Sequence, residues 1–198
     1  KENNKRFFVM YGQTEATARM SYLPNEYSIS KLGSMGIAIP DGKFSLKNEL
    51  NETIEESNVT GELIYEGPNV SMGYLDCLND LATNDENNGK LFTGDLAKRD
   101  VDGFYYIVGR KKRFLKIFGN RVNLDETERL LKDITTECAC TGNDDKIIVY
   151  TTDNLKIDKI RDYISSKLGL HHSAFSIKYI ESIPKNSNGK TIYSDLKF

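Results

Sequence analysis

The sequence lacks the marks of a secreted or membrane-spanning protein. Its three cysteines, Cys77, Cys138 and Cys140, are odd in number and lack the spacing of a disulfide framework, and the chain has no signal-like start. The Cys-Ala-Cys motif also lacks metal-ligand spacing, so we expect small buried thiols there and not a zinc site. No apolar run approaches about 18 residues, the length that spans a bilayer as a helix. We therefore expect a reducing compartment, a cytoplasmic location and no membrane span.

An overall excess of charge of one sign is also absent, because the net charge is −2, and this argues against a general nucleic-acid binder. The two parts of the chain differ, however. Residues 1–109 hold 10 Lys and Arg against 17 Asp and Glu, a net charge of −7, and residues 110–198 hold 17 against 12, a net charge of +5. We expect a domain boundary at the sign change, between residues 109 and 110.

Five cations crowd into seven positions at this boundary: Arg110, Lys111, Lys112, Arg113 and Lys116. Such a cluster can serve nucleic acid, a membrane, a phosphorylated small molecule or only the solvent. The nearby aromatic residues form no recognisable RNA motif, and the segment is too short for an amphipathic surface helix. RNA and membrane binding are therefore poorly supported, which leaves an anionic small molecule or a solvated run of charge.

Short strands are expected in the first 109 residues. The apolar run 6–10 predicts a buried strand, and Asp41-Gly42, between two apolar stretches, predicts a hairpin because glycine tolerates positive φ. Residues 61–67 and 103–109 are rich in β-formers and bracketed by glycine. The polar stretches 48–60 and 79–90 are expected as connections. This pattern predicts a small β-barrel or sandwich.

Strands and helices alternate after Gly109, which predicts a compact α+β unit and an α+β class for the whole chain. Strands are expected over residues 113–118, 146–152 and 175–180. Asn123 with Glu126 three residues later resembles a capping box, which predicts a helix start. The face of that helix would hold Thr127, Leu130, Leu131 and Ile134.

A second helix is predicted to end at Gly169, a typical C′ residue. Apolar residues recur before it at helical spacing, at Ile157, Ile160, Ile164 and Leu168. The tail contains Gly189-Lys190-Thr191, which is similar to the end of a Walker A loop. That motif needs a glycine five residues before Gly189, where Pro184 stands, so we reject a P-loop.

Four motifs, in this order, resemble the later core motifs of the adenylate-forming superfamily of acyl-CoA synthetases, luciferases and adenylation domains. They are YGQTE (11–15), TGD (93–95), GRKKRFLKIFGNRVNLDETE (109–128) and PKNSNGK (184–190). The resemblance implies that residues 1–109 end a large AMP-binding domain and that residues 110–198 form a mobile C-terminal domain. It also implies adenylation of a small carboxylic acid with Mg-ATP. The acyl group then passes to a thiol, from coenzyme A or from the phosphopantetheine arm of a carrier protein.

The resemblance also implies roles for single residues. Tyr11, with Gly12 beside it, would pack on adenine, Thr14 would bind the α-phosphate, and Glu15 would hold Mg²⁺, a cation that prefers oxygen ligands. Asp95 would accept the two ribose hydroxyls, because a carboxylate has two acceptor oxygens. Arg110 would contact ribose and phosphate. Read locally, the same residues are a strand-end tyrosine, a solvated glutamate, an Asx-type turn and a surface cation.

Lys190 matches the catalytic lysine of the family. An ammonium that meets the α-phosphate late stabilises the charge of the transition state more than bound ATP, and only this difference accelerates a reaction. Lys112 matches the hinge about which the C-terminal domain rotates, and Gly119 matches a loop that lines the thiol tunnel. We therefore assign the cation cluster to a hinge and a nucleotide-facing strand.

The phosphate loop that the family carries upstream of YGQTE is missing, and the chain begins without Met. We therefore expect a piece of a longer AMP-forming ligase that does not turn over by itself. No carrier-protein domain follows Lys190, which favours a free-standing ligase with coenzyme A as the acceptor. Two alternatives stay open: a non-catalytic nucleotide-binding or interaction module, and an adenylation enzyme that loads a carrier protein.

Overall fold

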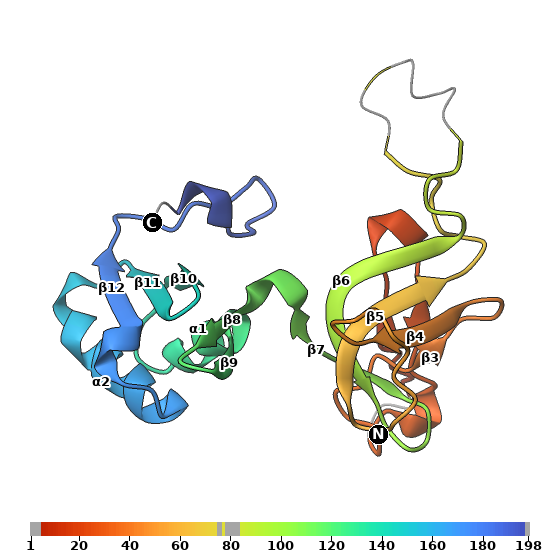
Figure 1. Cartoon of the computed structure of the whole chain (residues 1–198), viewed down its shortest axis with the longest axis horizontal. Helices are drawn as coiled ribbons and strands as arrows, with labels where there is room; N and C mark the ends of the chain where they lie inside the picture. Colours follow the sequence, from red (N-terminus) through yellow and green to blue (C-terminus); the bar gives the residue numbers. More distant parts are fainter. Residues whose placement is uncertain (1–4, 75–76, 78–83, 197–198) are drawn as a thin grey trace. The chain divides into compact units, whose positions relative to one another are not determined.

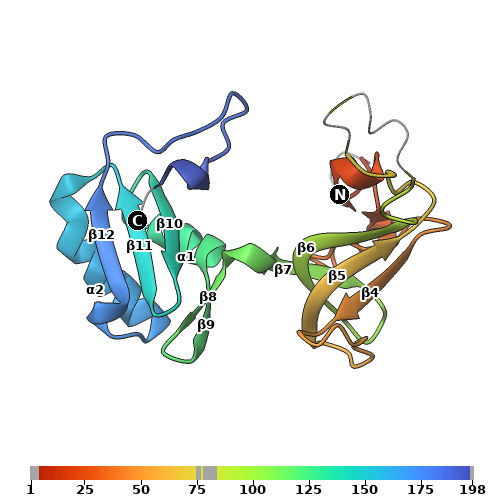
Figure 2. The same cartoon turned by 45° about the horizontal axis from the view of Figure 1, so that its top comes forward.

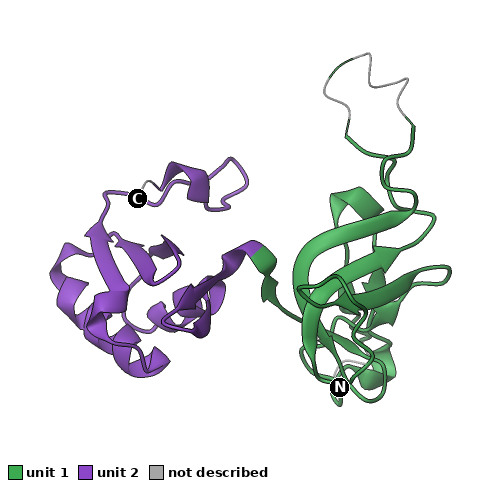
Figure 3. Cartoon of the chain, in the orientation of Figure 1, with its two compact units in different colours: residues 1–111 green, residues 112–198 purple. Residues whose placement is uncertain are grey.

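The computed structural model describes residues 5–74, 77 and 84–196 of the chain (Figure 1). Strands and short helices are mixed along it, which confirms the α+β class. Residues 1–111 and 112–198 form two compact units (Figure 3). Within the described residues, no helix is both long and apolar enough to cross a membrane.

The main sheet of the first unit is antiparallel and has the order β4-β5-β6-β7 (Figure 2). Its strands are β4 (Lys43–Lys47), β5 (Thr60–Glu66), β6 (Lys90–Arg99) and β7 (Tyr105–Arg110). Alternate side chains of these strands point into one core, as period-two patterning requires. That core includes Phe44, Leu46, Leu63, Tyr65, Leu91, Ala97 and Tyr105.

A smaller antiparallel sheet joins β1 (Met10–Tyr11), β2 (Ser21–Tyr22) and β3 (Ile37–Ala38). The expected buried strand over residues 6–10 is wrong, because only Met10 of this run lies in a strand and the Phe7 side chain is 70% exposed. Within the described residues, this apolar run has no core to pack against. Short 3₁₀ helices follow β1 at Thr14–Ala16 and β2 at Asn25–Tyr27.

The turn at Asp41-Gly42 does not make the predicted hairpin, because β3 and β4 belong to different sheets. Asp41, and not Gly42, takes the positive φ, at 64°. Gly42 is needed for close packing, since a Cβ there would lie 2.5 Å from Tyr65 Oη. Among the described residues, the strands of this unit form two sheets and no closed barrel. The predicted connection 48–60 lies mostly between β4 and β5, and part of the predicted connection 79–90 lies outside the described residues.

The second unit contains a three-stranded sheet in the order β10-β11-β12. β10 (Cys138–Asn143) and β11 (Lys146–Thr151) are antiparallel, and β12 (Phe175–Tyr179) is parallel to β11. Before them, β8 (Phe114–Ile117) and β9 (Asn120–Asn123) form a separate hairpin. The β10 strand was not expected. It buries Cys140 fully, as predicted, whereas Cys138 is only partly buried.

Helix α1 (Leu124–Leu131) begins at the predicted cap. The Asn123 side chain accepts hydrogen bonds from the backbone N–H of Asp125 at 2.9 Å and of Glu126 at 3.3 Å, and these satisfy N–H groups that a helix start leaves open. Helix α2 (Ile157–Leu168) ends at Gly169 with φ of 64°, which confirms the C-terminal prediction. The remaining 3₁₀ turns are Lys111–Arg113, Asn154–Lys156, His172–Ala174 and Tyr193–Asp195.

Strand β11 feeds two cores, one on each face of its sheet. On the helix face, Ile147 and Val149 pack with residues of both helices, among them Leu131, Ile160 and Ile164. On the other face, Ile148 and Tyr150 pack with two residues of the C-terminal tail, Ile183 and Leu196. The tail that carries Lys190 is therefore docked on the sheet at both of its ends.

Candidate functional site

A buried carboxylate, Asp95, is the centre of the candidate site in the first unit. It lies in β6 directly opposite Arg110 of β7, next to an irregularity in the register of the two strands. Gly94 before it has φ of 68°, which favours glycine. Thr93 fixes the backbone around Gly94, because its Oγ1 donates to Leu63 O at 2.7 Å and accepts from the Asp95 N–H at 3.1 Å.

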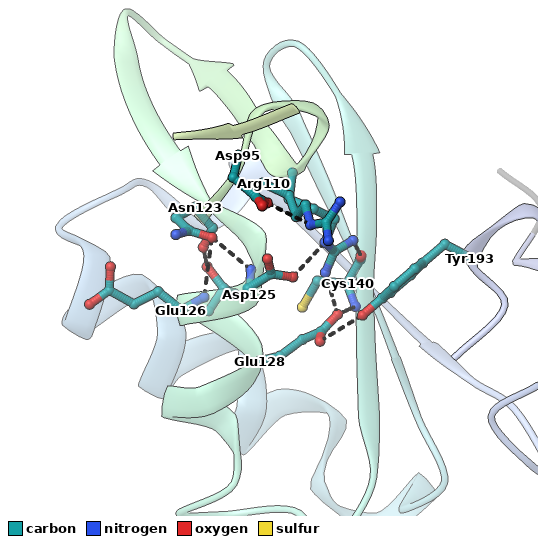
Figure 4. Close-up of polar contacts among 10 residues, drawn as sticks. Asp95, Arg110, Asn123, Asp125, Glu126, Glu128, Cys140 and Tyr193 are labelled. Carbon is teal, nitrogen blue, oxygen red and sulfur yellow. Dashed lines mark hydrogen bonds and ion pairs between the residues drawn. The ribbon is translucent and has the colours of Figure 1, made fainter. Parts of the chain in front are cut away.

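Three side chains converge on this carboxylate. Asp95 Oδ2 accepts from the Tyr11 hydroxyl at 2.5 Å and from Gln13 Nε2 at 2.9 Å. Asp95 Oδ1 accepts from Arg110 Nε at 2.7 Å, a contact that Figure 4 shows. The Asp95 side chain is 4% exposed and that of Arg110 is 60% exposed. Asp95 is thus fixed by its partners, whereas the guanidinium of Arg110 reaches into solvent.

Tyr11 is the strand-end tyrosine of the local reading, and it also makes a contact that the sequence did not predict. Its ring packs against the core of the first unit, and its hydroxyl donates to Asp95. Burial, together with the adjacent Asp95 carboxylate, raises the pKa of Tyr11 well above its usual value, so the phenol stays a neutral donor. Gln13, which also donates to Thr93 O at 3.0 Å, was missed by the sequence reasoning, although it stands inside the YGQTE motif.

The loop after Tyr11 carries Thr14 and Glu15 in a 3₁₀ turn. Thr14 is exposed, and the Glu15 carboxylate accepts a hydrogen bond from the Tyr74 hydroxyl. This bond holds the pKa of Glu15 below its usual range, so the carboxylate is ionised near neutral pH. Gly12 allows a close approach of backbones here, since a Cβ on it would lie 3.0 Å from Ala18 O.

Asn69 holds the far end of this loop and was also missed. Its Nδ2 donates to Ala16 O at 3.3 Å and to Arg19 O at 3.2 Å, and its Oδ1 accepts from the Tyr65 hydroxyl at 2.9 Å. The Tyr65 ring is itself fully buried. The conformation of the loop that carries Glu15 is therefore fixed from the core outward.

The cation cluster is largely neutralised within each unit. Lys111 pairs with Glu62 at 2.6 Å in the first unit, in addition to the Arg110–Asp95 pair. Arg113 pairs with Asp125 and Glu128 in the second unit, each at 2.6 Å. The sequence assigned the cluster to a hinge and a nucleotide-facing strand without a role for Arg113, and the structure pairs Arg113 with carboxylates of its own unit. Lys112, the first residue of the second unit, is exposed.

Gly119 lies at the tip of the β8–β9 hairpin. It has φ of 83°, and the preceding Phe118 has φ of 47° and is exposed. Two successive residues with positive φ are typical of a tight type I′ turn. The tip is tied to the next hairpin, because the Phe118 N–H donates to Asp145 Oδ1 at 2.7 Å.

Lys190 stands in an ordered loop of the second unit. Asn186 organises this loop: its Oδ1 accepts from the N–H groups of Asn188 and Lys190, both at 3.0 Å, and its own N–H donates to Lys190 O at 2.9 Å. Gly189 has φ of 76°, and Lys185 and Thr191 form a β-bridge at the base. The Lys190 side chain is exposed.

The structure therefore brings Tyr11, Asp95 and Arg110 together in the first unit, with Thr14 and Glu15 on the loop that follows Tyr11. Lys112, Gly119 and Lys190 belong to the second unit.

Comparison with known proteins agrees with these motifs. The family model described as AMP-binding enzyme matches residues 1–75. A 2-succinylbenzoate–CoA ligase of Bacillus licheniformis is 30% identical, with 91% of this chain and 39% of that protein covered. A probable 4-coumarate–CoA ligase of Dictyostelium discoideum is also 30% identical, with 94% of this chain and 36% of that protein covered.

Among solved structures, the o-succinylbenzoate–CoA synthetase of Bacillus subtilis, in complex with an acyl-adenylate intermediate, has a TM-score of 0.74 and 25% identity. The match covers 100% of this chain and 42% of that one. The chain belongs to the adenylate-forming, AMP-binding superfamily. It spans 36% to 39% of the length of the two curated relatives.

Proposed function

We propose that the chain is the C-terminal part of an AMP-forming ligase, which adenylates a carboxylic acid with ATP and transfers the acyl group to a thiol. The main support is the convergence of Tyr11, Gln13 and Arg110 on the buried Asp95 carboxylate, from motifs far apart in the sequence. The names of the relatives, which are acid–CoA ligases, favour coenzyme A as the thiol. A carrier-protein arm is the second candidate.

The site residues have the chemistry that a nucleoside monophosphate needs. Asp95 offers carboxylate oxygens to the ribose hydroxyls. A carboxylate has about four acceptor sites, of which the protein donors fill three, so one stays open and a second would open if the exposed Arg110 turned from Asp95 to a ligand. Arg110 offers guanidinium donors for phosphate, and Thr14 offers an exposed hydroxyl. The ring of Tyr11 offers a face for adenine.

Glu15 fits a magnesium ion, because its carboxylate is ionised and Mg²⁺ is usually held by one or two carboxylates together with substrate phosphates. When bound, the ion would neutralise charge on the phosphates of ATP. The hydrogen bond from Tyr74 orients the carboxylate.

In the first half-reaction, a carboxylate oxygen of the acid forms a bond to the α-phosphorus of ATP, and pyrophosphate leaves. Lys190 would stabilise the negative charge that gathers on the α-phosphate. In the second half-reaction, a thiolate attacks the acyl carbonyl and AMP leaves. Rotation about Lys112 would separate the two steps, and Gly119 would then line the path of the thiol.

In this proposal, residues 1–109 are a barrel-like remnant at the end of the large domain and residues 110–198 are the mobile C-terminal domain, while the two structural units divide two residues later, between Lys111 and Lys112. A cytoplasmic location agrees with the thiols of Cys138 and Cys140.

ATP–pyrophosphate exchange with a panel of aromatic carboxylic acids tests the proposal. The 198-residue chain should show none, and the same chain extended upstream to the length of its relatives should show exchange with at least one acid. Robust exchange by the short chain would overturn its inactivity. No exchange by the extended chain with any acid would count against the ligase, and calorimetry with AMP would then test the rival, a binding module.

A further inference from the structure

We propose that Tyr193 is a positioning residue for Lys190, and that Arg113 and Glu128 form the platform on which it sets the lysine loop. This inference rests on the proposed role of Lys190 in adenylation.

Tyr193 stands three residues after Lys190 and is held on two sides. Its ring lies over the guanidinium of Arg113, with 3.9 Å between the Arg113 Cζ and the ring centroid. Its hydroxyl donates to Glu128 Oε2 at 3.0 Å (Figure 4). A cation over an aromatic face is attractive, and more so when both groups are partly desolvated. The stacking contact therefore fixes the orientation of the Tyr193 ring, and the hydrogen bond fixes the position of its hydroxyl.

The platform under Tyr193 is a closed polar network. The side chains of Arg113 and Glu128 are 12% and 17% exposed. Arg113 donates through Nη2 to Glu128 Oε1, through Nε to Asp125 and through Nη1 to Cys140 O at 2.7 Å. Glu128 Oε1 also accepts from the Cys140 N–H at 2.7 Å.

These contacts join the start of the unit, helix α1 and strand β10 to the tail. Arg113 directly follows Lys112, so the proposed hinge and the lysine loop are connected through adjoining side chains of one unit. Replacement of a buried ion pair by nonpolar residues of similar volume often leaves the stability of a fold unchanged or raises it. A network that fixes geometry has a clearer use here than one that adds stability.

The other end of the loop is held independently. Ile183 is buried against Ile148 and Tyr150, and Lys185 pairs with Glu137. Leu196 is buried on the same face after Tyr193. The loop is thus clamped on both sides while the side chain of Lys190 remains exposed. Three residues separate Tyr193 from Lys190, and three extended residues span about 10 Å. If Tyr193 lost its contacts, the position of the Lys190 ammonium could therefore vary by several ångströms.

Tryptic cleavage after Lys190 in the 198-residue chain tests the clamp without any activity. Tyr193→Leu should speed this cleavage about tenfold or more, because proteases cut segments in proportion to how often they open. Tyr163→Leu is the matched control, since Tyr163 also donates to a carboxylate, Asp133, and has a cation, Lys167, over its ring. Cleavage after Lys190 should not change in the control. An unchanged rate in Tyr193→Leu, with the fold intact by circular dichroism, would refute the clamp.

The upstream-extended enzyme tests the positioning role. Tyr193→Leu should lower the rate of adenylation about tenfold or more while thioester formation from a supplied acyl-adenylate stays within about twofold, because only the first step needs Lys190. Tyr193→Phe, which keeps the stacked ring, should recover most of the rate. Equal loss in both steps would mark a merely structural residue and overturn the inference.

The two failures are distinguishable through Lys190→Ala. If that variant adenylates normally, the proposed function of Lys190 is wrong, and the cleavage result still decides whether Tyr193 clamps the loop. If Lys190→Ala is inactive in adenylation and Tyr193→Leu is fully active, the positioning role alone is refuted.

Discussion

Asp95 and Arg110 face each other across β6 and β7, and the Arg110 Nε donates to Asp95 Oδ1 at 2.7 Å. The carboxylate is buried and its cationic partner is largely exposed. The pair thus joins a fixed acceptor to a guanidinium in solvent, at the last residue of β7. An exposed cation can exchange its protein partner for a ligand at low cost, because solvent already competes for it.

Asp95→Asn should weaken binding of AMP to the chain at least about tenfold, because an amide keeps the shape but loses one acceptor and the charge. It should also lower the free energy of unfolding by roughly 2 kcal/mol, since Tyr11, Gln13 and Arg110 lose a charged partner. Titration calorimetry and urea denaturation measure the two effects.

Glu62→Gln is the matched control for this variant. Glu62 pairs with Lys111, the neighbour of Arg110, on the same sheet. Its substitution should leave AMP binding within about twofold, because the Lys111 partner is largely exposed and solvent screens its charge. AMP affinity that survives in Asp95→Asn would remove Asp95 from the ribose site.

Tyr11 contributes a hydroxyl and a ring, and two substitutions separate them. Tyr11→Phe should cost about 1–2 kcal/mol in unfolding free energy, since a donor to a buried carboxylate is lost, and should change AMP affinity little. Tyr11→Leu also removes the aromatic face and should weaken AMP binding clearly. Equal AMP affinity in the two variants would show that the ring does not contact adenine.

Lys190→Ala, made in the chain extended to the length of its relatives, should lower adenylation by roughly two to three orders of magnitude, as for the loss of other groups that stabilise a transition-state charge. Thioester formation from preformed adenylate should persist. Lys159, exposed on α2, offers the control, and Lys159→Ala should leave both steps unchanged. Stopped-flow assays of each half-reaction would reveal a shared loss, which would contradict the assignment.

Alkaline pH should destabilise the second unit through its thiols. Burial raises the pKa of Cys138 from 9.0 to about 11 and that of Cys140 well above 9.0. A thiol whose pKa is raised in the folded state contributes stability that is fully present below the pKa of the unfolded state. This stability is lost as pH rises through the pKa of the folded state. For Cys138 the window is therefore about pH 9 to 11, and because this thiol is only partly buried, solvent screening makes the loss smaller than the full pKa shift would give.

Urea denaturation at about pH 8 and about pH 10.5 measures this loss. The double variant Cys138→Ala, Cys140→Ala should show a clearly smaller drop between the two pH values. Cys77→Ala, which removes an exposed thiol, should show the drop of the unaltered chain. An undiminished drop in the double variant would exclude the thiols as the cause.

Local chemistry explains which elements the sequence predicted correctly. Asn123 and Gly169 mark helix ends because each satisfies backbone groups by itself, without help from distant residues. The sequence did not predict β6, because Gly94 interrupts its alternation of apolar and polar residues. It did not predict β10, because that strand consists largely of small residues. The strand predicted at residues 6–10 was wrong because an apolar run needs a core to cover it, and Phe7 finds none among the described residues.

The site divides in the same way. The motifs named Asp95, Tyr11 and Arg110 one by one, but the hydrogen bonds among them depend on the pairing of β6 with β7 and of β1 with β2. Asn69 carries no local signal, because an amide is a common loop residue until its partners are known. Gln13 lies inside the YGQTE motif, but its role as a donor depends on the position of Asp95. The sequence also did not show that Arg113 of the cation cluster is neutralised by Asp125 and Glu128, which lie on the helix that follows it.

The hydrophobic cores on the two faces of β11 differ in size, and this difference determines which part of the unit unfolds first. Twelve buried residues make up the core on the helix face and five make up the core under the tail. The free energy of local unfolding grows with the apolar surface that unfolding exposes. Residues 180–196 should therefore unfold as a separate cooperative segment, at a lower free energy than the helices. Amide hydrogen exchange should then be slow in the two helices and the sheet of this unit and faster in residues 180–196, which pack against one face of β11.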